Sequence, residues 1–451
     1  MTECSQTFFA FEAHFSRPVT ARFDGAEMTT DGGALLLRAV DKKVRLLQRV
    51  VAGFTDGRDA QRVEHELSEM LAQRIYGLAL GYEDVNDHEE LRHDPLLGVL
   101  AGKRELHEPL AGKSTLNRLE LTPTDEPHRY HKITYSAEAL DALLVEIFLE
   151  AHAQPPREIV LDLDVTDLPL HGQQEARFFH GYYGHYCYLP LYIFCGEHLL
   201  CARLRSANQD ASAGSVEEVA RIVQQIRRRW PRVRIILRAD SGFCREELMT
   251  WCENHTVNYV FGLARNSRLR RKIAAEMRQA KQKQQRSGQA ARVFAEFRYR
   301  TRKSWCCYRR VVAKAEYLEK GENPRFLVTS LVMQPWPAQK LYEQLYCARG
   351  EMENRIKEQL SLFSDRLSTE TLRANQLRLY FSSLAYVLLH ALRRLALAGT
   401  EWASAQAETI RLRLLKIAAE VRLTARRIWV RYSRAYPWKS FFAVAHAALS
   451  G

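Results

Sequence analysis

Carboxylate side chains occur inside one apolar, strand-like segment of the chain and directly after another. In the segment 159–165, alternation places Asp162 and Asp164 on the face opposite the leucines. Acidic residues inside an apolar strand are costly to bury unless they are paired or bind a metal ion. Asp240 follows the apolar segment 233–239, at the carboxyl end of a strand, where open α/β sheets place their sites. Taken alone, Asp240 could equally be the N-cap of the next helix.

A third carboxylate lies in a helical segment with basic and aromatic neighbours. One face of this helix, an arc of ~80° at about 100° per residue, contains Tyr346, Arg349, Glu353 and Lys357. The alternative is a solvated stripe, in which Glu353 forms i,i+4 ion pairs with Arg349 and Lys357. Phosphoryl transfer on DNA needs two metal ions ~3.5–4 Å apart, held by carboxylates from different elements. The three acidic positions together therefore favour a site, with Asp164 as first choice on its strand and Asp162 as second.

The elements that must position these carboxylates follow the order β-β-β-α-β-α-β. Strands are predicted over 159–165, 188–195, 199–204, 233–239 and 257–263, and helices over 215–229 and 245–253. Three strands able to form a meander, followed by two βα units, predict a mixed sheet with helices on its faces. This is the element order of the ribonuclease-H-like fold, so by analogy we expect an α/β protein with a core of that kind. Two long helices are predicted over 339–360 and 372–397.

The net charge of +13 is concentrated in two parts of the 451 residues. Residues 265–314 contain 17 Lys and Arg against two Glu, and residues 391–451 contain 11 against three Glu. Such density predicts a nucleic-acid partner rather than a solvated helix face and loop. We expect four regions: a mainly helical N-terminal DNA-binding domain (1–155), a catalytic core (156–265 and 325–398), a basic β-containing insertion domain (266–324) and a basic helical C-terminal region (399–451).

Other classes of protein are disfavoured. The first residues lack the basic and apolar pattern of a signal peptide, and the longest apolar run, 379–389, is too short to span a bilayer. Nine cysteines form no C-x-x-C pair, which disfavours a zinc ribbon or a disulfide framework and suits a reducing cytoplasm. A phosphate-binding loop around Lys113 would need glycine at position 107, which is His107. We therefore expect a cytoplasmic protein with no membrane partner and no nucleotide cofactor.

An aromatic run occupies residues 178–186, after the first aspartate strand. Rings of this kind stack on the bases of an opened DNA end, or they pack the hairpin to which they belong. The sequence favours neither interpretation, and the same holds for Trp305 and Trp429.

The segments around the carboxylates resemble the DDE transposases of bacterial insertion sequences. The resemblance is to the insertion-sequence 1380 family, within the superfamily that bears a Tyr-Arg-Glu-Lys signature. The matching motifs are Asp164-Val-Thr166, Ala239-Asp240-Ser241-Gly242-Phe243 and Tyr346-x-x-Arg349-x-x-x-Glu353. Segments at 74–84, 91–95 and 426–430 also resemble that family, so the resemblance extends over nearly the whole chain.

The resemblance implies that Asp164, Asp240 and Glu353 hold two Mg²⁺ ions, for which Mn²⁺ would substitute. Tyr346, Arg349 and Lys357 would grip DNA phosphates near the cut. The signature places its lysine seven residues after the glutamate, where this chain has Leu360, and Lys357 one turn earlier is the substitute.

The implied reaction is metal-dependent strand cleavage at terminal inverted repeats, followed by attack of the freed 3′-OH on target DNA. The implied assembly is a homodimer in a synaptic complex with double-stranded DNA. We expect the basic regions to bind that DNA through Arg298, Arg300, Arg302, Lys303, Arg426 and Arg427. Two alternatives stay open: a catalytically inactive, domesticated DNA-binding regulator on the same scaffold, and a non-specific nuclease.

Overall fold

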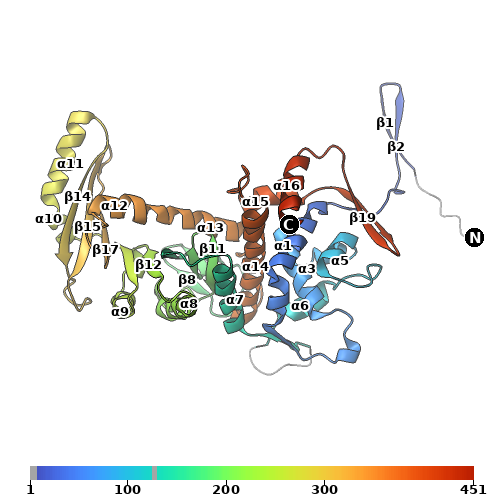
Figure 1. Cartoon of the computed structure of the whole chain (residues 1–451), viewed down its shortest axis with the longest axis horizontal. Helices are drawn as coiled ribbons and strands as arrows, with labels where there is room; N and C mark the ends of the chain where they lie inside the picture. Colours follow the sequence, from blue (N-terminus) through green and yellow to red (C-terminus); the bar gives the residue numbers. More distant parts are fainter. Residues whose placement is uncertain (1–7, 124–129, 451) are drawn as a thin grey trace, which may run out of the picture.

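One large mixed sheet organises the chain in the computed structural model, which describes residues 8–123 and 130–450 (Figure 1). The sheet runs in the order β11-β10-β6-β12-β13-β17-β15-β14, with the short β16 beside β15. β12 is parallel to both β6 and β13, and the other pairs are antiparallel. The strands are β6 (Glu158–Val165), β10 (Leu191–Cys195), β11 (His198–Arg203), β12 (Arg234–Ala239), β13 (Asn258–Leu263), β14 (Ala291–Tyr299), β15 (Arg309–Leu318), β16 (Gly321–Glu322) and β17 (Arg325–Thr329). The predicted α/β class and mixed sheet are confirmed.

Apolar side chains on both faces of the central strands bring helices onto the sheet. One face is covered by α7 (Ala137–Glu150), α8 (Ser215–Arg229) and α9 (Glu246–Asn254). α8 buries Val219, Ile222, Val223 and Ile226, which recur with helical spacing, and it keeps three arginines in its last turn. This periodicity is why α8 and α9 lie within one residue of the helices predicted at 215–229 and 245–253.

The opposite face carries a helical rod that runs from Ala338 to Ser361. It consists of α12 (Ala338–Lys340), a π-helical turn (Leu341–Tyr346), a 3₁₀ turn (Cys347–Arg349) and α13 (Gly350–Ser361). Leu341 and Leu345 of the rod pack on Ile236 and Val260 of the sheet. The sequence predicts this helix over 339–360, but its middle is not α-helical. π-helical turns occur frequently at functional sites, and this one ends at a candidate site residue.

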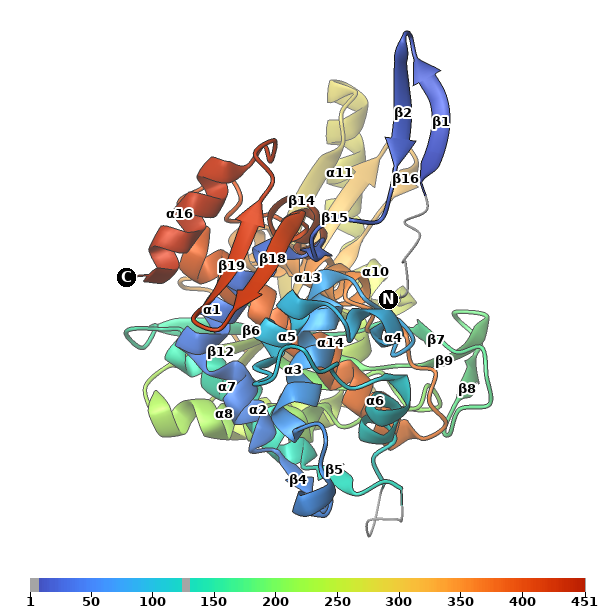
Figure 2. The same cartoon turned by 90° about the vertical axis from the view of Figure 1, so that its right-hand side faces the viewer.

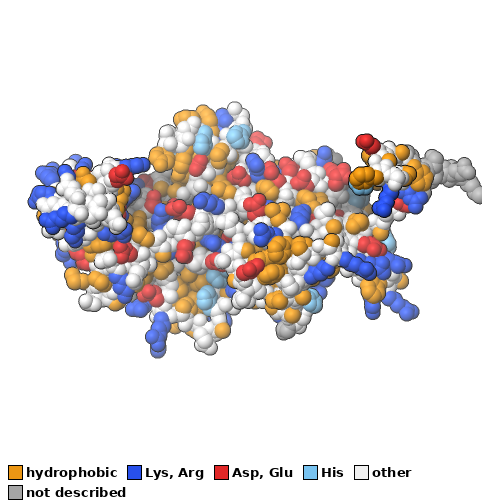
Figure 3. Space-filling model, turned by 90° about the horizontal axis from the view of Figure 1, so that it is seen from above, with side chains coloured by type: hydrophobic (Ala, Val, Ile, Leu, Met, Phe, Trp, Pro, Cys, Tyr) orange, Lys and Arg blue, Asp and Glu red, His pale blue; other side chains and the backbone are white. Residues whose placement is uncertain are grey.

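The basic segment forms the outer end of the same sheet. α11 (Ala274–Ser287) packs on β14 and β15, and α10 (Ser267–Lys272) precedes it. We expected a distinct insertion domain at 266–324, but its strands instead continue the core sheet, because β15 pairs with β17 and buries Val311 and Ala313 in the same cluster as β6 and β12. Figure 3 shows Lys and Arg side chains gathered at this end of the molecule.

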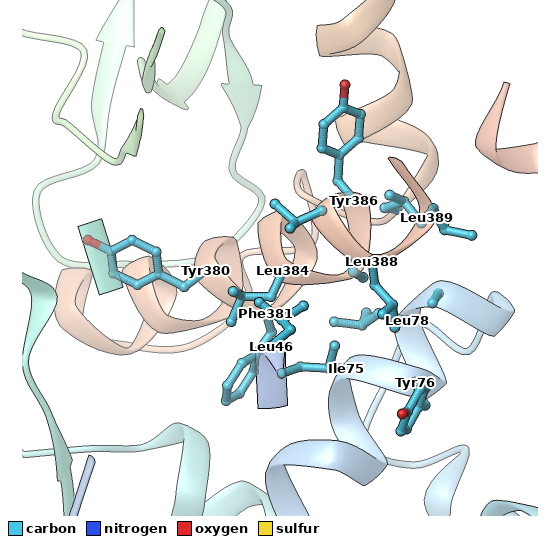
Figure 4. Close-up of a cluster of buried hydrophobic side chains, with 14 of the residues drawn as sticks. Leu46, Ile75, Tyr76, Leu78, Tyr380, Phe381, Leu384, Tyr386, Leu388 and Leu389 are labelled. Carbon is cyan, nitrogen blue, oxygen red and sulfur yellow. The ribbon is translucent and has the colours of Figure 1, made fainter. Parts of the chain in front are cut away.

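A second core lies where α14 (Leu372–Ala396) packs on the N-terminal helices. Figure 4 shows Phe381, Leu384 and Leu388 of α14 beside Ile75 and Leu78 of α3. The helices of this region are α1 (Leu35–Val44), α2 (Leu46–Val51), α3 (Leu67–Leu80), α4 (His88–Leu91), α5 (Pro95–Ala101) and α6 (Lys113–Glu120), and the strands β4 (Phe54–Asp56) and β5 (Ile133–Tyr135) pair beside them. α14 also contacts β11, so one helix belongs to both cores.

The C-terminal region departs from the helical prediction for 399–451. β18 (Ala419–Thr424) and β19 (Arg427–Tyr432) form a hairpin that is joined by β3 (Met28–Thr29) and followed by α16 (Lys439–Ser450). The prediction was wrong here because residues 419–432 alternate with a period of two, the pattern of a strand. Figure 2 shows a further hairpin, of β1 (Phe9–His14) and β2 (Arg17–Ala21), extending away from the body. Among the described residues, no helix is both long and apolar enough to cross a bilayer.

Candidate active site

Asp162, the second choice for the first carboxylate, is buried and paired inside the sheet. It lies beside Arg238 in the parallel register of β6 and β12. Its two oxygens accept hydrogen bonds from Nε and Nη2 of Arg238, at 2.5 and 2.7 Å. Nη1 of Arg238 donates to the carbonyl of Leu345 on the rod. The pair thus uses both carboxylate oxygens of Asp162 to tie β6, β12 and the rod together.

Asp164 lies near the carboxyl end of β6, and its side chain is only partly accessible. Its Oδ2 accepts a hydrogen bond from Nη1 of Arg349 at 2.7 Å, and its Oδ1 accepts one from the backbone of Val165. Burial and the neighbouring carboxylate of Asp240 raise the pKa of Asp164 to about 6, against the lowering effect of Arg349. Two carboxylates held close together in this way form a place where added positive charge is favourable.

Asp240 follows β12 and caps the 3₁₀ turn Ser241–Phe243. Its Oδ1 accepts a hydrogen bond from the backbone of Gly242 at 2.8 Å, so Asp240 caps this short turn, whereas the next helix, α9, begins after Arg245 and not after Asp240. The same carboxylate is close enough to Asp164 and Arg349 to raise the pKa of both. Because a carboxylate has two oxygens, capping and participation in a site are compatible.

Tyr346 reaches the Asp240 turn at Gly262 of β13. A Cβ atom at Gly262 would lie 2.8 Å from Tyr346 Oη and 2.8 Å from the backbone nitrogen of Ser241. Glycine within a strand permits such a close approach. Burial raises the pKa of Tyr346, so its hydroxyl stays protonated and can donate a hydrogen bond. Neither Gly262 nor Arg238 was predicted from the sequence, although a glycine inside a strand was a signal for the first.

Arg349 joins two of the carboxylates. Its Nη1 is 2.7 Å from Asp164 Oδ2, and its Nη2 is 3.1 Å from Glu353 Oε1. The Glu353 side chain is 54% exposed, and its i,i+4 pair with Arg349 is the one that the surface-stripe alternative predicts. Lys357 is exposed and, within the described residues, forms no ion pair with Glu353. The structure therefore pairs Asp164 and Glu353 with one guanidinium, and Asp240 is near enough to raise the pKa of that guanidinium.

These residues suit Mg²⁺ in donor chemistry, because that ion prefers carboxylate oxygens. Asp164 lies in β6 and Asp240 follows the adjacent strand β12, and the carboxylate of Asp240 raises the pKa of Asp164. Across 8–123 and 130–450, no three acidic, His or Cys side chains stand close enough to hold one metal ion. The guanidinium of Arg349 occupies the position between Asp164 and Glu353. The fit thus covers the two aspartates, whereas Glu353 is paired with Arg349.

The remaining DNA-binding candidates lie at the turns of two hairpins. Between β14 and β15, Arg300, Arg302 and Lys303 are exposed, and Arg298 donates a hydrogen bond to the Tyr308 carbonyl at 2.6 Å. In the other hairpin, Arg426 lies in the β18–β19 turn and Arg427 is the first residue of β19, where its guanidinium lies over the exposed Trp429 ring. Figure 1 shows these hairpins toward opposite ends of the long axis, with β12 and α13 between them. The structure therefore does not bring these cations to the carboxylates. Trp305, by contrast, is buried.

Comparison with known proteins gives a family match over nearly the whole chain. Residues 11–451 match the family model described as transposase DDE domain group 1. A search of curated proteins finds no match. Among solved structures, the chain is similar to the piggyBac transposase in its synaptic complex with hairpin DNA, at 10% identity and a TM-score of 0.42, covering 86% of this chain and 80% of that one.

Proposed function

The chain belongs to the family of transposases with a group 1 DDE domain, and we propose that it cuts DNA at terminal inverted repeats and transfers the freed ends into target DNA. One observation carries the proposal. Asp164 of β6 and Glu353 of α13 both pair with Arg349, and Asp240, which follows β12, raises the pKa of both Asp164 and Arg349. A ribonuclease-H-like core and membership of the insertion-sequence 1380 family are parts of the same proposal.

In this proposal Asp164, Asp240 and Glu353 are the ligands of two Mg²⁺ ions. Bound ions of this kind stabilise the attacking and leaving oxygens of phosphoryl transfer. Arg349 exchanges its carboxylate partners for a DNA phosphate, which a guanidinium binds through two parallel hydrogen bonds. The Tyr346 hydroxyl, held beside the Asp240 turn, donates a hydrogen bond to the same strand.

Positively charged surfaces away from the carboxylates position the duplex. Lys357 adds an exposed charge on α13, one turn beyond Glu353. The two basic hairpin turns, together with the N-terminal region, bind the terminal repeats, and a homodimer holds both transposon ends. Because phosphate contacts position DNA without reading its bases, these cations set register rather than sequence preference.

The test is strand cleavage of the DNA that flanks the encoding gene, with Mg²⁺, with Ca²⁺ and without metal, and with binding scored on the same samples. We expect Mg²⁺-dependent nicks at discrete, symmetric positions. Asp240→Asn, which keeps an acceptor for the cap, and Glu353→Gln should abolish the nicks and retain binding. Glu351→Gln is the matched control, because Glu351 is an exposed carboxylate on the same helix and, within the described residues, forms no ion pair with Arg349.

Two results would favour the other candidates. Specific binding without cleavage in any metal would identify a catalytically inactive DNA-binding regulator. Cleavage without preference for particular positions would identify a non-specific nuclease. Cleavage by the Glu353→Gln variant at the unchanged rate would remove Glu353 from the ligand set.

A further inference from the structure

An aromatic hairpin next to the candidate active site has no role in the proposed function. β8 (Phe178–His180) pairs with β9 (His185–Tyr188), which also pairs with β7 (Leu168–Pro169). Its exposed rings are Phe178 (46% exposed), Phe179 (49%), Tyr182 (87%) and Tyr186 (43%). The rings therefore do not serve only to pack the hairpin, which was one of the two interpretations of the sequence. Adjacent exposed apolar side chains of this size mark a binding surface.

The rings of the hairpin pack edge to face beside a positive charge. Phe179 and Tyr186 lie opposite each other in the strand register, with ring centroids 5.5 Å apart. The Arg177 guanidinium lies over the Tyr186 ring, 4.4 Å from its centroid. Tyr182 adds a ring at the turn, 5.1 Å from that of Tyr183. The hairpin thus combines π-faces with a positive charge, which suits stacked bases better than it suits an aliphatic protein surface.

The hairpin is fixed close to the carboxylates. His185 Nε2 lies 2.8 Å from Asp167 Oδ2, and Asp167 is three residues beyond Asp164. Tyr183 and Val165 both pack on a small buried cluster of Cys187, Leu189 and Ala207. Figure 2 shows β8 and β9 standing out from the body beside β7. A strand whose phosphate lies at Asp164 therefore has its adjoining nucleotides within reach of the rings.

We propose that the β8–β9 hairpin binds unpaired nucleotide bases next to the bond on which the carboxylates act, by stacking them on Phe179 and Tyr182 beside the Arg177–Tyr186 pair. Bases within a duplex already stack on each other, so the ligand is a DNA end whose strands are separated. This inference rests on the proposed function, because DNA reaches the hairpin through its attachment at the carboxylates. The hairpin then keeps the end open by occupying the base faces.

The test measures DNA binding by the full chain without divalent metal, so that no cleavage occurs. The probes are a blunt duplex, the same duplex ending in unpaired thymidines, and a fork whose unpaired positions are abasic. The double variant Phe179→Leu/Tyr182→Leu keeps apolar area but removes the π-faces. Phe178→Leu is the matched control, since Phe178 is a ring of similar exposure to Phe179 on the same strand and lies on the face opposite Phe179 and Tyr186. Thermal unfolding checks that each variant is folded.

We expect the unaltered protein to prefer the thymidine fork to both other probes. The double variant should lose that preference, by about 5- to 150-fold for each stacked base, and keep its affinity for the blunt duplex. Equal affinity of the unaltered protein for all three probes, or an unchanged preference in the double variant, overturns the inference and leaves the proposed function standing. If the double variant keeps the fork preference but sediments differently from the unaltered protein, the rings form a contact between protein chains. That result also overturns the inference. Failure to bind any DNA overturns both proposals.

Discussion

Replacing Asp162 by Asn should destabilise the fold and spare cleavage, whereas Asp164→Asn should abolish cleavage and leave the fold nearly as stable. The two aspartates share a strand face and differ in their partners. Asp162 gives both oxygens to Arg238, whose side chain is 8% exposed. Asp164 instead faces Asp240 and the guanidinium of Arg349.

The magnitudes follow from what each substitution leaves behind. Asp162→Asn leaves the buried guanidinium of Arg238 without a counter-charge. Removing one partner of a buried pair costs about 3–5 kcal/mol, and the retained amide oxygen and the Leu345 carbonyl favour the lower end of that range. After Asp164→Asn, Arg349 keeps its pair with Glu353, so the free energy of unfolding should fall by only ~1 kcal/mol.

The assay pairs urea unfolding at neutral pH with Mg²⁺-dependent cleavage, at a temperature where both variants are folded. The expected result is a lower unfolding midpoint for Asp162→Asn and an absence of nicks for Asp164→Asn. The reverse pattern, in which a folded Asp162→Asn variant is inactive and Asp164→Asn cleaves normally, would refute the assignment of Asp164 as the first ligand.

Three further predictions test other parts of the structure. Gly262→Ala should lower the rate of cleavage at least ~10-fold and the free energy of unfolding by about 1–3 kcal/mol, because the added Cβ would collide with the Asp240 turn. Gly350→Ala, which has open space around its Cβ, should change neither quantity. Equal effects of the two substitutions would contradict this reasoning. Burial lowers the pKa of His88 to about 3, so its contribution to the free energy of unfolding should be complete above pH ~6.5 and decrease as the pH drops toward 3, by about 2 kcal/mol at pH 5. His88→Gln should flatten the measured curve of unfolding free energy against pH. An unchanged curve would contradict this assignment. Arg302→Ala with Lys303→Ala should reduce the slope of log affinity for DNA against log salt concentration by about 0.9 for each phosphate that is no longer neutralised, and an unchanged slope would remove these exposed residues from the DNA surface.

Regular local patterns made half of the sheet predictable. Alternation in β6 and the apolar run of β12 predicted strands whose ends carry Asp164 and Asp240, and helical spacing predicted α8. The sequence could also place Arg349 and Glu353 on one helix face. Asp164 and Asp240 interact because β6 pairs in parallel with β12. The order of the predicted elements favours this pairing, but local sequence patterns do not determine it.

Long-range pairing accounts for what could not be predicted. The choice between Asp162 and Asp164 depends on Arg238, which lies 76 residues away in sequence from Asp162. The bridging position of Arg349 depends on the π-helical and 3₁₀ turns, which have no simple sequence signature. The sequence of β15 alone predicts a basic strand, and only its pairing with β17 makes it part of the core sheet. The assignment of the site residues as metal ligands and DNA contacts stays a prediction until cleavage and binding are measured.

The helix α14 has a consequence for how this protein can be divided. Its apolar side chains complete the N-terminal core, and the same helix packs on β11 of the sheet. A fragment ending near residue 155 would therefore expose Ile75 and Leu78 to solvent, because Phe381 and Leu384 would be missing. The N-terminal helices are thus not a portable module that gene fusion could move between proteins. Any shuffling of this architecture in evolution must carry the C-terminal half along with the N-terminal one.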